Sequence, residues 1–233
     1  MLLPIRAAYG LLNRLLFSGA FGDVSLRRAL LIFLPKEPFN LIDIGACDGD
    51  FYETLSREKK IAAAVLVEPR AAACKAMEKR FRGRPRLTIL QDLLCSEAKK
   101  VNFHVNSVGD TSSILTAIDS RIGAPIATET IAARTLDDAA ESLPGTIGLL
   151  KIDVQGAELE VLKGGEKTLA RTEFAWIEVS FKPLYQGSAL FDDIQAHMRE
   201  KDFILFNVSP AYRGKDGELL CADCLYKKRV MAK

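Results

Sequence analysis

Acidic side chains recur where short apolar segments end, and two of them lie beside turns that could hold a ligand. Asp43 precedes Gly45 and Gly49 in LIDIGACDGD, and Glu68 ends the apolar segment AAAVLVE. A carboxylate such as Glu68 can accept hydrogen bonds from both hydroxyls of a ribose. Asp43 would repel a pyrophosphate and attract an ammonium group. The two motifs therefore predict a ligand that combines a nucleoside with a cationic portion.

The glycine turn differs from the fingerprint of dinucleotide-binding proteins. Gly45 and Gly49 allow a tight turn and a close approach of the backbone to a ligand, and we expect Ala46 to contact that ligand too. The spacing is not G-x-G-x-x-G, because Cys47 stands where the middle glycine lets a pyrophosphate approach. An NAD-dependent oxidoreductase would share this turn and Glu68, and these differences argue against it.

Two further residues complete the predicted cofactor site. Pro69 follows Glu68, and Asp92 ends the third predicted strand, where a polar side chain can meet the edge of an adenine. Aspartate is also common in surface loops, so both interpretations of Asp92 stay open. A ribose, an adenine and a cationic amino-acid portion together describe S-adenosylmethionine.

A carboxylate beside the predicted cofactor site could act as a general base for a bound substrate, the acceptor of the reaction. Asp153 ends a strongly apolar strand, and we expect it to orient the acceptor or accept its proton; capping the next helix is the alternative. Lys151 lies two residues earlier on the same face of that strand and could pair with Asp153. Glu178, in WIEVSF, is either a site carboxylate or a buried, paired one.

Other polar residues have weaker claims to a role in the site. Glu158 falls in the first turn of a predicted helix, where the helix dipole alone favours a carboxylate. His104 and His197 lie on an added strand and on a polar helix, as structural histidines do. Cys221 and Cys224 lack the two further ligands of a zinc site, and the oxygen ligands for magnesium are incomplete, so we predict no metal.

The elements that carry these residues alternate between strands and helices. The predicted strands of the main sheet cover 39–45, 62–69, 87–94, 147–154, 174–181, 203–209 and 221–229, the last two joined by a hairpin at Asp216-Gly217. The predicted helices cover 50–60, 71–81, 157–170 and 191–201, and Thr135 and Asp137 are expected to cap a further helix. Residues 101–105 and 128–134 are expected to form an added antiparallel pair.

This alternation predicts an α/β fold. We expect a mainly parallel, seven-stranded, Rossmann-like sheet with a C-terminal antiparallel hairpin at one edge and helices on both faces. Ligands of such sheets bind beyond the carboxyl ends of the strands, where the acidic residues fall. The length of 233 residues favours one domain, residues 37–233, after an N-terminal helical extension, residues 1–36.

Net charge and cysteine content limit which partners and which cellular compartment are expected. The formal net charge is +2, and basic residues alternate with acidic ones, so no nucleic-acid partner is expected. Five cysteines at irregular spacing suggest reduced thiols in a cytoplasmic protein. Apolar segments in residues 1–36 are too short to span a bilayer; they could lie on an anionic membrane surface or pack against the domain. The oligomeric state is not predicted.

Several motifs together resemble the FkbM family of S-adenosylmethionine-dependent methyltransferases. They are D-x-G-x-x-x-G from Asp43, the segment LLKIDVQGAELEVLKGG (149–165), which is similar to the family signature K-I-D-V-E-G-A-E, the Ser112-Ser113 loop, and the segments ARTLDDA and CADCLYKKR. The resemblance covers about residues 39–229. It implies the Rossmann-like methyltransferase fold, S-adenosylmethionine as cofactor, and an O-methyltransferase that acts on a hydroxyl of a sugar, glycolipid or secondary metabolite.

One residue departs from the family pattern. Gln155 stands where the family generally has glutamate, so a role that needs a carboxylate at this position is lost or moved. This departure keeps another interpretation open, a catalytically silent domain that binds S-adenosylmethionine, or that binds a partner protein through the N-terminal helices. The small-molecule or glycan acceptor itself is not identified by the sequence.

Overall fold

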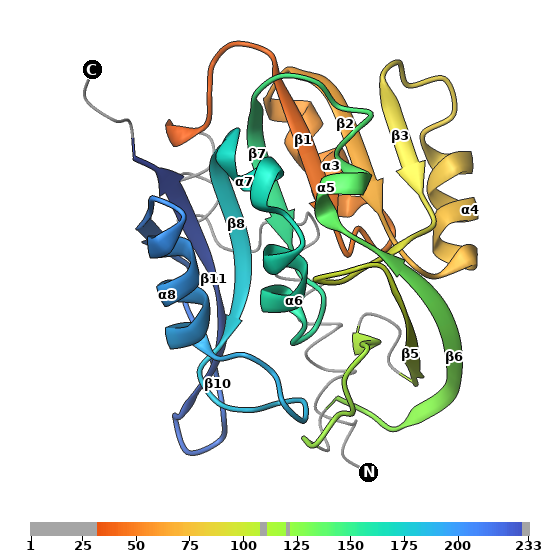
Figure 1. The fold of residues 1–233 in the computed structure, drawn as a ribbon, viewed down its shortest axis with the longest axis vertical. Coiled ribbons are helices and arrows are strands. Elements are labelled where there is room, and N and C mark those ends of the chain that lie inside the picture. The colour runs from red at the N-terminus through yellow and green to blue at the C-terminus, as the bar shows by residue number, and fades with distance from the viewer. Residues whose placement is uncertain (1–31, 108–110, 120–121, 230–233) are drawn as a thin grey trace.

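A mainly parallel sheet runs through the molecule, with helices on both faces (Figure 1). The structure is a computed structural model and describes residues 32–107, 111–119 and 122–229. The strands of this sheet are β1 (Phe39–Ile44), β2 (Ile61–Val67), β3 (Leu87–Leu90), β7 (Ile147–Ile152), β8 (Thr172–Ser180), β9 (Phe203–Val208), β10 (Tyr212–Arg213) and β11 (Leu219–Lys228). Their order is β10-β11-β8-β7-β1-β2-β3, with β9 also paired to β11.

The topology confirms the predicted Rossmann-like class and refines the predicted hairpin. Strands β1, β2, β3, β7 and β8 pair in parallel, while β11 pairs antiparallel with β8 on one side and with β9 and β10 on the other. The sheet therefore has eight strands, with β11 inside it. Ala222, Cys224, Leu225 and Tyr226 are fully buried, as an interior strand requires.

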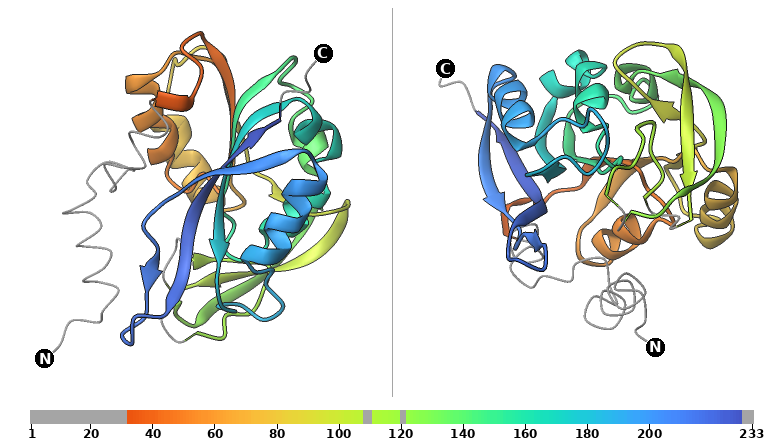
Figure 2. Two further views of the ribbon diagram at one scale, coloured as in Figure 1. Left: turned by 90° about the vertical axis from the view of Figure 1, so that its left-hand side faces the viewer. Right: turned by 90° about the horizontal axis from the view of Figure 1, so that it is seen from below.

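Six helices cover the two faces of the sheet in the described part of the chain. They are α3 (Asp50–Glu58), α4 (Ala71–Arg80), α5 (Leu136–Ala139), α6 (Glu158–Lys163), α7 (Glu166–Ala170) and α8 (Phe191–Glu200). Figure 2 shows α3 and α4 on one face and α5 to α8 on the other. Each face has its own apolar core, with Leu55 and Met77 on the first and Leu162 and Met198 on the second.

The helix predicted over 157–170 is two helices, because glycines break it. A Cβ on Gly164 would lie 2.3 Å from the backbone oxygen of Cys95, so the chain bends there to pack closely. Thr135 caps α5 as predicted, in a capping box with Asp138. Asp137 does not cap α5; its carboxylate accepts hydrogen bonds from the backbone N–H groups at the start of α7.

A second, three-stranded sheet carries one wall of the site. Its strands are β4 (Leu93–Leu94), β5 (Lys99–Asn106) and β6 (Pro125–Arg134), in the order β4-β6-β5. The predicted antiparallel pair is thus present and longer than expected. The strand predicted over 87–94 is split, because its last residues leave the main sheet and pair with β6. β5 and β6 extend beyond the carboxyl ends of the central strands (Figure 1).

Much of the predicted N-terminal extension, residues 1–36, lies outside the described residues, which begin at 32. Its helices and its membrane contact therefore stay predictions, as does the division into domains. No helix of the described segments has the length and apolar character needed to cross a membrane. All five cysteines are free thiols, Cys221 and Cys224 on β11 included.

Candidate active site

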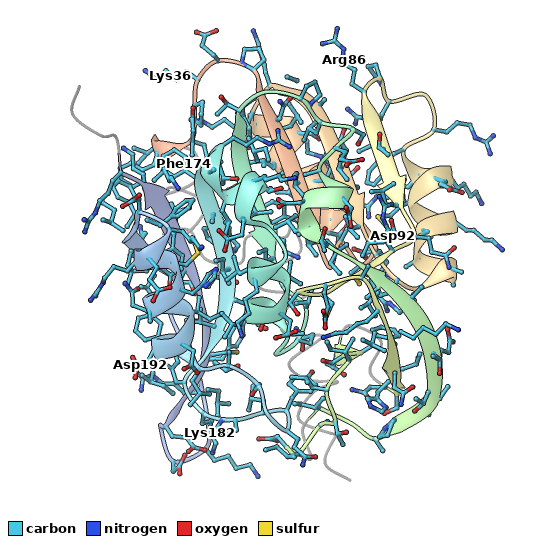
Figure 3. All side chains as sticks on the ribbon, viewed as in Figure 1. Lys36, Arg86, Asp92, Phe174, Lys182 and Asp192 are labelled. Atoms are coloured by element: carbon cyan, nitrogen blue, oxygen red, sulfur yellow. The ribbon has the colours of Figure 1, made fainter. Side chains whose placement is uncertain are left out.

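A pocket that opens to solvent lies at the carboxyl ends of β1, β2 and β7. Its lining includes five of the predicted site residues, Gly45, Glu68, Pro69, Asp92 and Asp153. Figure 3 labels Asp92 at the turn that follows β3. Asp43 and Ala46 are buried behind this surface. The structure thus brings the strand-end carboxylates together, as parallel strands of one sheet must.

The two glycines of the first turn are required by packing. Gly45 has φ +74°, and a Cβ there would lie 1.9 Å from the backbone oxygen of Asp153. Gly49 has φ +82°, and a Cβ there would lie 2.4 Å from the ring of Phe81. The turn after β1 therefore packs directly on the turn after β7. Gly45 also lines the pocket, whereas Gly49 packs against α4 and its neighbouring residue Phe81.

Glu68 is held in place by neighbours on both sides. Its Oε2 accepts a hydrogen bond from the backbone N–H of Cys47 at 3.0 Å. Its Oε1 accepts from the backbone N–H of Arg70 at 3.0 Å and from Arg70 Nε at 2.6 Å. A carboxylate oxygen can accept two hydrogen bonds, so Oε2 has capacity for a ribose hydroxyl. The sequence interpretation missed Arg70, although it follows Glu68 by only two residues.

Asp92 lines the pocket while it is paired with a residue of the second sheet. Arg134 Nη1 lies 3.0 Å from Asp92 Oδ2. The apolar part of this wall includes Leu93, Phe103 and Ile114, which sequence reasoning also missed. Phe103 lies on the added strand pair, so only the packing of the second sheet shows that it reaches the pocket.

Lys151 lies between two carboxylates at the base of the site. Its Nζ is 3.4 Å from Asp43 Oδ1 and 3.6 Å from Asp153 Oδ2, and it donates to the backbone oxygen of Gly45 at 3.0 Å. Burial raises the pKa of Asp43, and Lys151 opposes this shift. Burial also lowers the pKa of Lys151, but the charges of Asp43 and Asp153 outweigh it and raise the pKa above its usual value. The predicted pairing of Lys151 with Asp153 is present.

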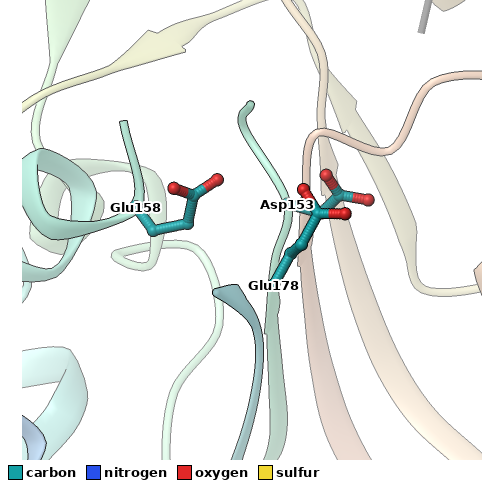
Figure 4. A group of neighbouring side chains, drawn as sticks. All are labelled: Asp153, Glu158 and Glu178. Carbon is teal, nitrogen blue, oxygen red and sulfur yellow. The ribbon is translucent and has the colours of Figure 1, made fainter. Parts of the chain in front are cut away.

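Three carboxylates converge beside the pocket (Figure 4). Asp153, Glu158 and Glu178 each place one oxygen within 4.8 Å of the others. Burial, and then the charge of Asp153, raise the pKa of Glu178 well above its usual value. Burial raises the pKa of Glu158 to about 7, although the backbone N–H groups of Val154 and Gly156 donate to its Oε1.

A fourth carboxylate, which the sequence interpretation missed, belongs to the same cluster. Asp223 on β11 is in register with Glu178 on β8. Burial and the charge of Asp153 raise the pKa of Asp223 to about 7. The signal in the sequence was the acid in CADCLYKKR, whose importance depends on β11 lying next to β8.

Gln155 joins two members of the cluster. Its Nε2 donates to Asp153 Oδ1 at 2.9 Å and to Glu178 Oε2 at 3.2 Å. The hydroxyl of Tyr185 donates to Gln155 Oε1 at 2.9 Å. An amide nitrogen thus already bridges two of the carboxylates that a cation would use, so we assign the group to a hydrogen-bonded network. That the site uses no metal stays a prediction.

The Ser112-Ser113 loop lines the pocket, whereas the two histidines, Phe181 and Tyr185 are not part of the lining. His104 bonds Thr128 across β5 and β6, and burial lowers the pKa of His197 on α8, so both agree with a structural role. Tyr185 is 2% exposed, and the half-buried Phe181 packs against Phe191.

The donor set fits S-adenosylmethionine. Glu68 can accept a ribose hydroxyl, and Asp43 and Asp153 share the ammonium of Lys151. Within the described residues, neither oxygen of the buried Asp43 accepts a hydrogen bond. Such an excess of negative charge favours a ligand that carries a sulfonium and an ammonium over one that carries a pyrophosphate. Fold and site together define a methyltransferase of the Rossmann-like class.

The family comparison agrees. The family model of the methyltransferase FkbM domain matches residues 43–205, and the chain belongs to this family. S-adenosylmethionine is the cofactor. The predicted family, fold and cofactor are therefore confirmed.

Particular relatives narrow the comparison. The chain is 28% identical over 180 residues to the 2-O-methyltransferase NoeI of Sinorhizobium fredii. The match covers 71% of this chain and 73% of NoeI. The FkbM methyltransferase of Methylobacillus flagellatus KT has a TM-score of 0.53 at 16% identity, over 80% of this chain and 43% of that chain. This chain thus spans less than half the length of that structure.

A further solved structure shows the fold alone. The magnesium protoporphyrin IX methyltransferase of Synechocystis PCC 6803, solved with bound S-adenosylmethionine, has a TM-score of 0.51 at 9% identity. It covers 86% of this chain and 76% of that chain.

Proposed function

We propose that the protein is an O-methyltransferase that transfers a methyl group to a hydroxyl of a sugar, glycolipid or secondary metabolite. The observation that carries this proposal is the carboxylate cluster at the edge of the cofactor pocket, with Asp153 as its pocket-lining member. A hydroxyl is a weak nucleophile, and a carboxylate in reach of its proton supplies the general base that the reaction needs.

S-adenosylmethionine supplies the activated methyl group when it is bound. The turn after β1 and Glu68 bind the cofactor, and Asp43 compensates its positive charge from below. Asp153 lies at the pocket surface with 34% of its side chain exposed, so we assign it the role of orienting the acceptor hydroxyl and accepting its proton. Lys151 neutralises part of the charge of Asp153. Gln155 connects Asp153 to Glu178, because its amide nitrogen donates to both carboxylates.

The assignment of Asp153 as the base follows from the difference between the carboxylates. Glu178 and Glu158 have raised pKa values, and burial is the main cause of both shifts. Burial thus favours the protonated form of both groups, and a protonated carboxyl cannot take up a proton from a substrate. Asp153 is the cluster member that both lines the pocket and faces an ammonium group.

A relative supports oxygen as the target. NoeI is described as a 2-O-methyltransferase, and its match covers 71% of this chain and 73% of NoeI. The interpretation as a catalytically silent domain predicts the opposite result in an assay of methyl transfer. It also gives no reason for an acidic cluster beside the cofactor pocket.

The experiment is a labelling assay. The protein is incubated with isotope-labelled S-adenosylmethionine and cell extracts fractionated into glycans, lipids and small metabolites, and mass spectrometry detects any species that gains one methyl group. We expect the wild type to label one class, Asp153→Asn to lose labelling, and Asp192→Asn, an exposed control on α8, to retain it. Absence of labelling by a wild type that binds S-adenosylhomocysteine would support the silent domain.

A further inference from the structure

The side-chain amide of Gln155 lies within the acidic cluster, and all of its polar atoms have partners. One amide nitrogen donates to two carboxylates, Asp153 Oδ1 at 2.9 Å and Glu178 Oε2 at 3.2 Å. The amide oxygen accepts from the hydroxyl of Tyr185 at 2.9 Å. The amide nitrogen faces the two carboxylates, and the amide oxygen faces the hydroxyl of Tyr185. If the amide group were flipped, its oxygen would face both carboxylates.

The backbone of Gln155 is also held in an unusual conformation. Its φ is +60°, in the left-handed region that residues other than glycine rarely adopt. The hydroxyl of Ser113 donates to its backbone oxygen at 2.8 Å, from the connection between β5 and β6. Strained residues of this kind persist where their surroundings hold them, and they occur preferentially at functional sites. Gln155 lines the pocket.

The partner of the amide is itself fixed. Tyr185 is 2% exposed, and its hydroxyl also lies 2.9 Å from the backbone oxygen of Thr111. The contacts of Gln155 thus link three connections: the one after β7 that carries it, the one after β8 that carries Tyr185, and the one after β5 that carries Thr111 and Ser113. All three lie at the same end of the main sheet.

We propose that Gln155 is a positioning residue of the acceptor site, which holds the carboxylates of Asp153 and Glu178 together as a pair while Tyr185 fixes the amide. This inference rests on the proposed O-methyl transfer. Two carboxyl groups at this separation repel each other when both are ionised, and charge-assisted hydrogen bonds from the amide offset that repulsion. The amide thereby keeps Asp153 at the pocket surface without adding a charge of its own.

Removing the amide hydrogens should shift the pKa of Glu178 in a predictable direction. Hydrogen bonds donated to a carboxylate stabilise its ionised form, so their loss raises the pKa of Glu178 further. The loss of one bond to a charged group corresponds to about tenfold in the ionisation equilibrium, or about one pH unit. The other titratable groups that face the pair are Lys151 on β7, Asp43 on β1, Glu158 on α6, and Cys221 and Asp223 on β11.

The variants separate positioning from folding. Gln155→Leu has a similar volume and no donors, and Gln155→Glu replaces the donors by a third carboxyl group. Tyr185→Phe leaves Gln155 intact and removes the hydroxyl that contacts both the amide oxygen and the backbone oxygen of Thr111. Gln186→Glu makes the same chemical change at an exposed side chain outside the pocket lining and is the matched control. Each is prepared as the full chain, and its fold is checked by circular dichroism.

The deciding measurement is a ¹³C NMR titration of glutamate labelled at the side-chain carboxyl carbon, with the Glu178 resonance assigned through Glu178→Gln. We expect the Glu178 midpoint to rise by about one pH unit in Gln155→Leu and in Gln155→Glu, less in Tyr185→Phe, and not at all in Gln186→Glu. An unchanged midpoint in Gln155→Leu would overturn the proposal. If that variant does not fold, an unchanged midpoint in Tyr185→Phe overturns it.

The titration needs no acceptor, so it separates this inference from the proposed function. A shifted midpoint in a protein that methylates nothing in the labelling assay would support the pairing of the carboxylates and reject O-methyl transfer. With an acceptor from that assay, Gln155→Leu should lower kcat about tenfold and move the acidic limb of the pH profile upward. A lower melting temperature with an unchanged pH profile would mean that Gln155 serves only the fold.

Discussion

Replacing Gly45 by alanine tests whether the turn after β1 and the turn after β7 pack as one unit. The added Cβ would lie 1.9 Å from the backbone oxygen of Asp153 and 2.9 Å from its carbonyl carbon. Ordinary carbon–oxygen contacts are about 3.3 Å or longer, so the two turns would have to separate by more than about 1 Å. Asp153 would move with its backbone.

The expected loss of folding free energy has three parts. A left-handed φ costs a residue other than glycine about 1–2 kcal/mol. Separation of the turns also weakens the backbone hydrogen bond from Asp153 N–H to the oxygen of Ile44, now 3.1 Å, which is worth about 1 kcal/mol. With the residual overlap, we expect the free energy of unfolding to fall by about 3 kcal/mol or more. A displacement of about 1 Å should slow methyl transfer about 100-fold.

Gly83→Ala is the matched control. Gly83 has φ +81°, and a Cβ there would meet nothing within 4 Å, so this variant has the backbone strain without the overlap. We expect it to lose only about 1–2 kcal/mol and to keep its turnover. Urea unfolding gives the stabilities, and the labelling assay gives the rates. Equal losses in the two variants would refute the argument that the turns pack directly on each other.

Three further changes address the charged groups. Lys151→Met leaves Asp43 and Asp153 without their shared ammonium, and we expect urea unfolding to show a loss of about 3–5 kcal/mol; a loss below about 1 kcal/mol would contradict a structural ion pair. Asp43→Asn should weaken S-adenosylhomocysteine binding about tenfold by calorimetry, and unchanged affinity would reject its role as a countercharge. Glu158, with its pKa raised to about 7, contributes stability that is present below its unfolded pKa and lost as pH rises through 7. As pH rises over this range, the free energy of unfolding of Glu158→Gln should therefore fall by up to about 3 kcal/mol less than that of the wild type. An equal fall in the two proteins would count against a buried carboxyl at Glu158.

Local patterns in the sequence predicted most of the sheet and the ends of its strands. Asp43, Glu68, Asp92 and Asp153 follow apolar segments, and parallel strands bring their carboxyl ends to one edge. The hairpin signal at Asp216-Gly217 was also correct, because a turn depends mainly on its own residues. These features need no knowledge of distant packing.

Contacts between distant residues set the rest. The partner of Gly45 is the backbone of Asp153, and the gap that requires a glycine exists only after β1 and β7 have paired. Asp223 joins the cluster because β11 lies inside the sheet beside β8, whereas the sequence suggested only an added edge. Gln155 was identified as a departure from a family pattern, but its role depends on Tyr185, thirty residues further along.

The central claim is that the acidic site directs the methyl group to oxygen. Its most direct test is NMR of the purified product formed with ¹³C-methyl S-adenosylmethionine. We predict a methoxy carbon in the wild-type product, and none when Asp153 is replaced by asparagine. Label on nitrogen, sulfur or carbon would contradict the assignment of the acceptor as a hydroxyl.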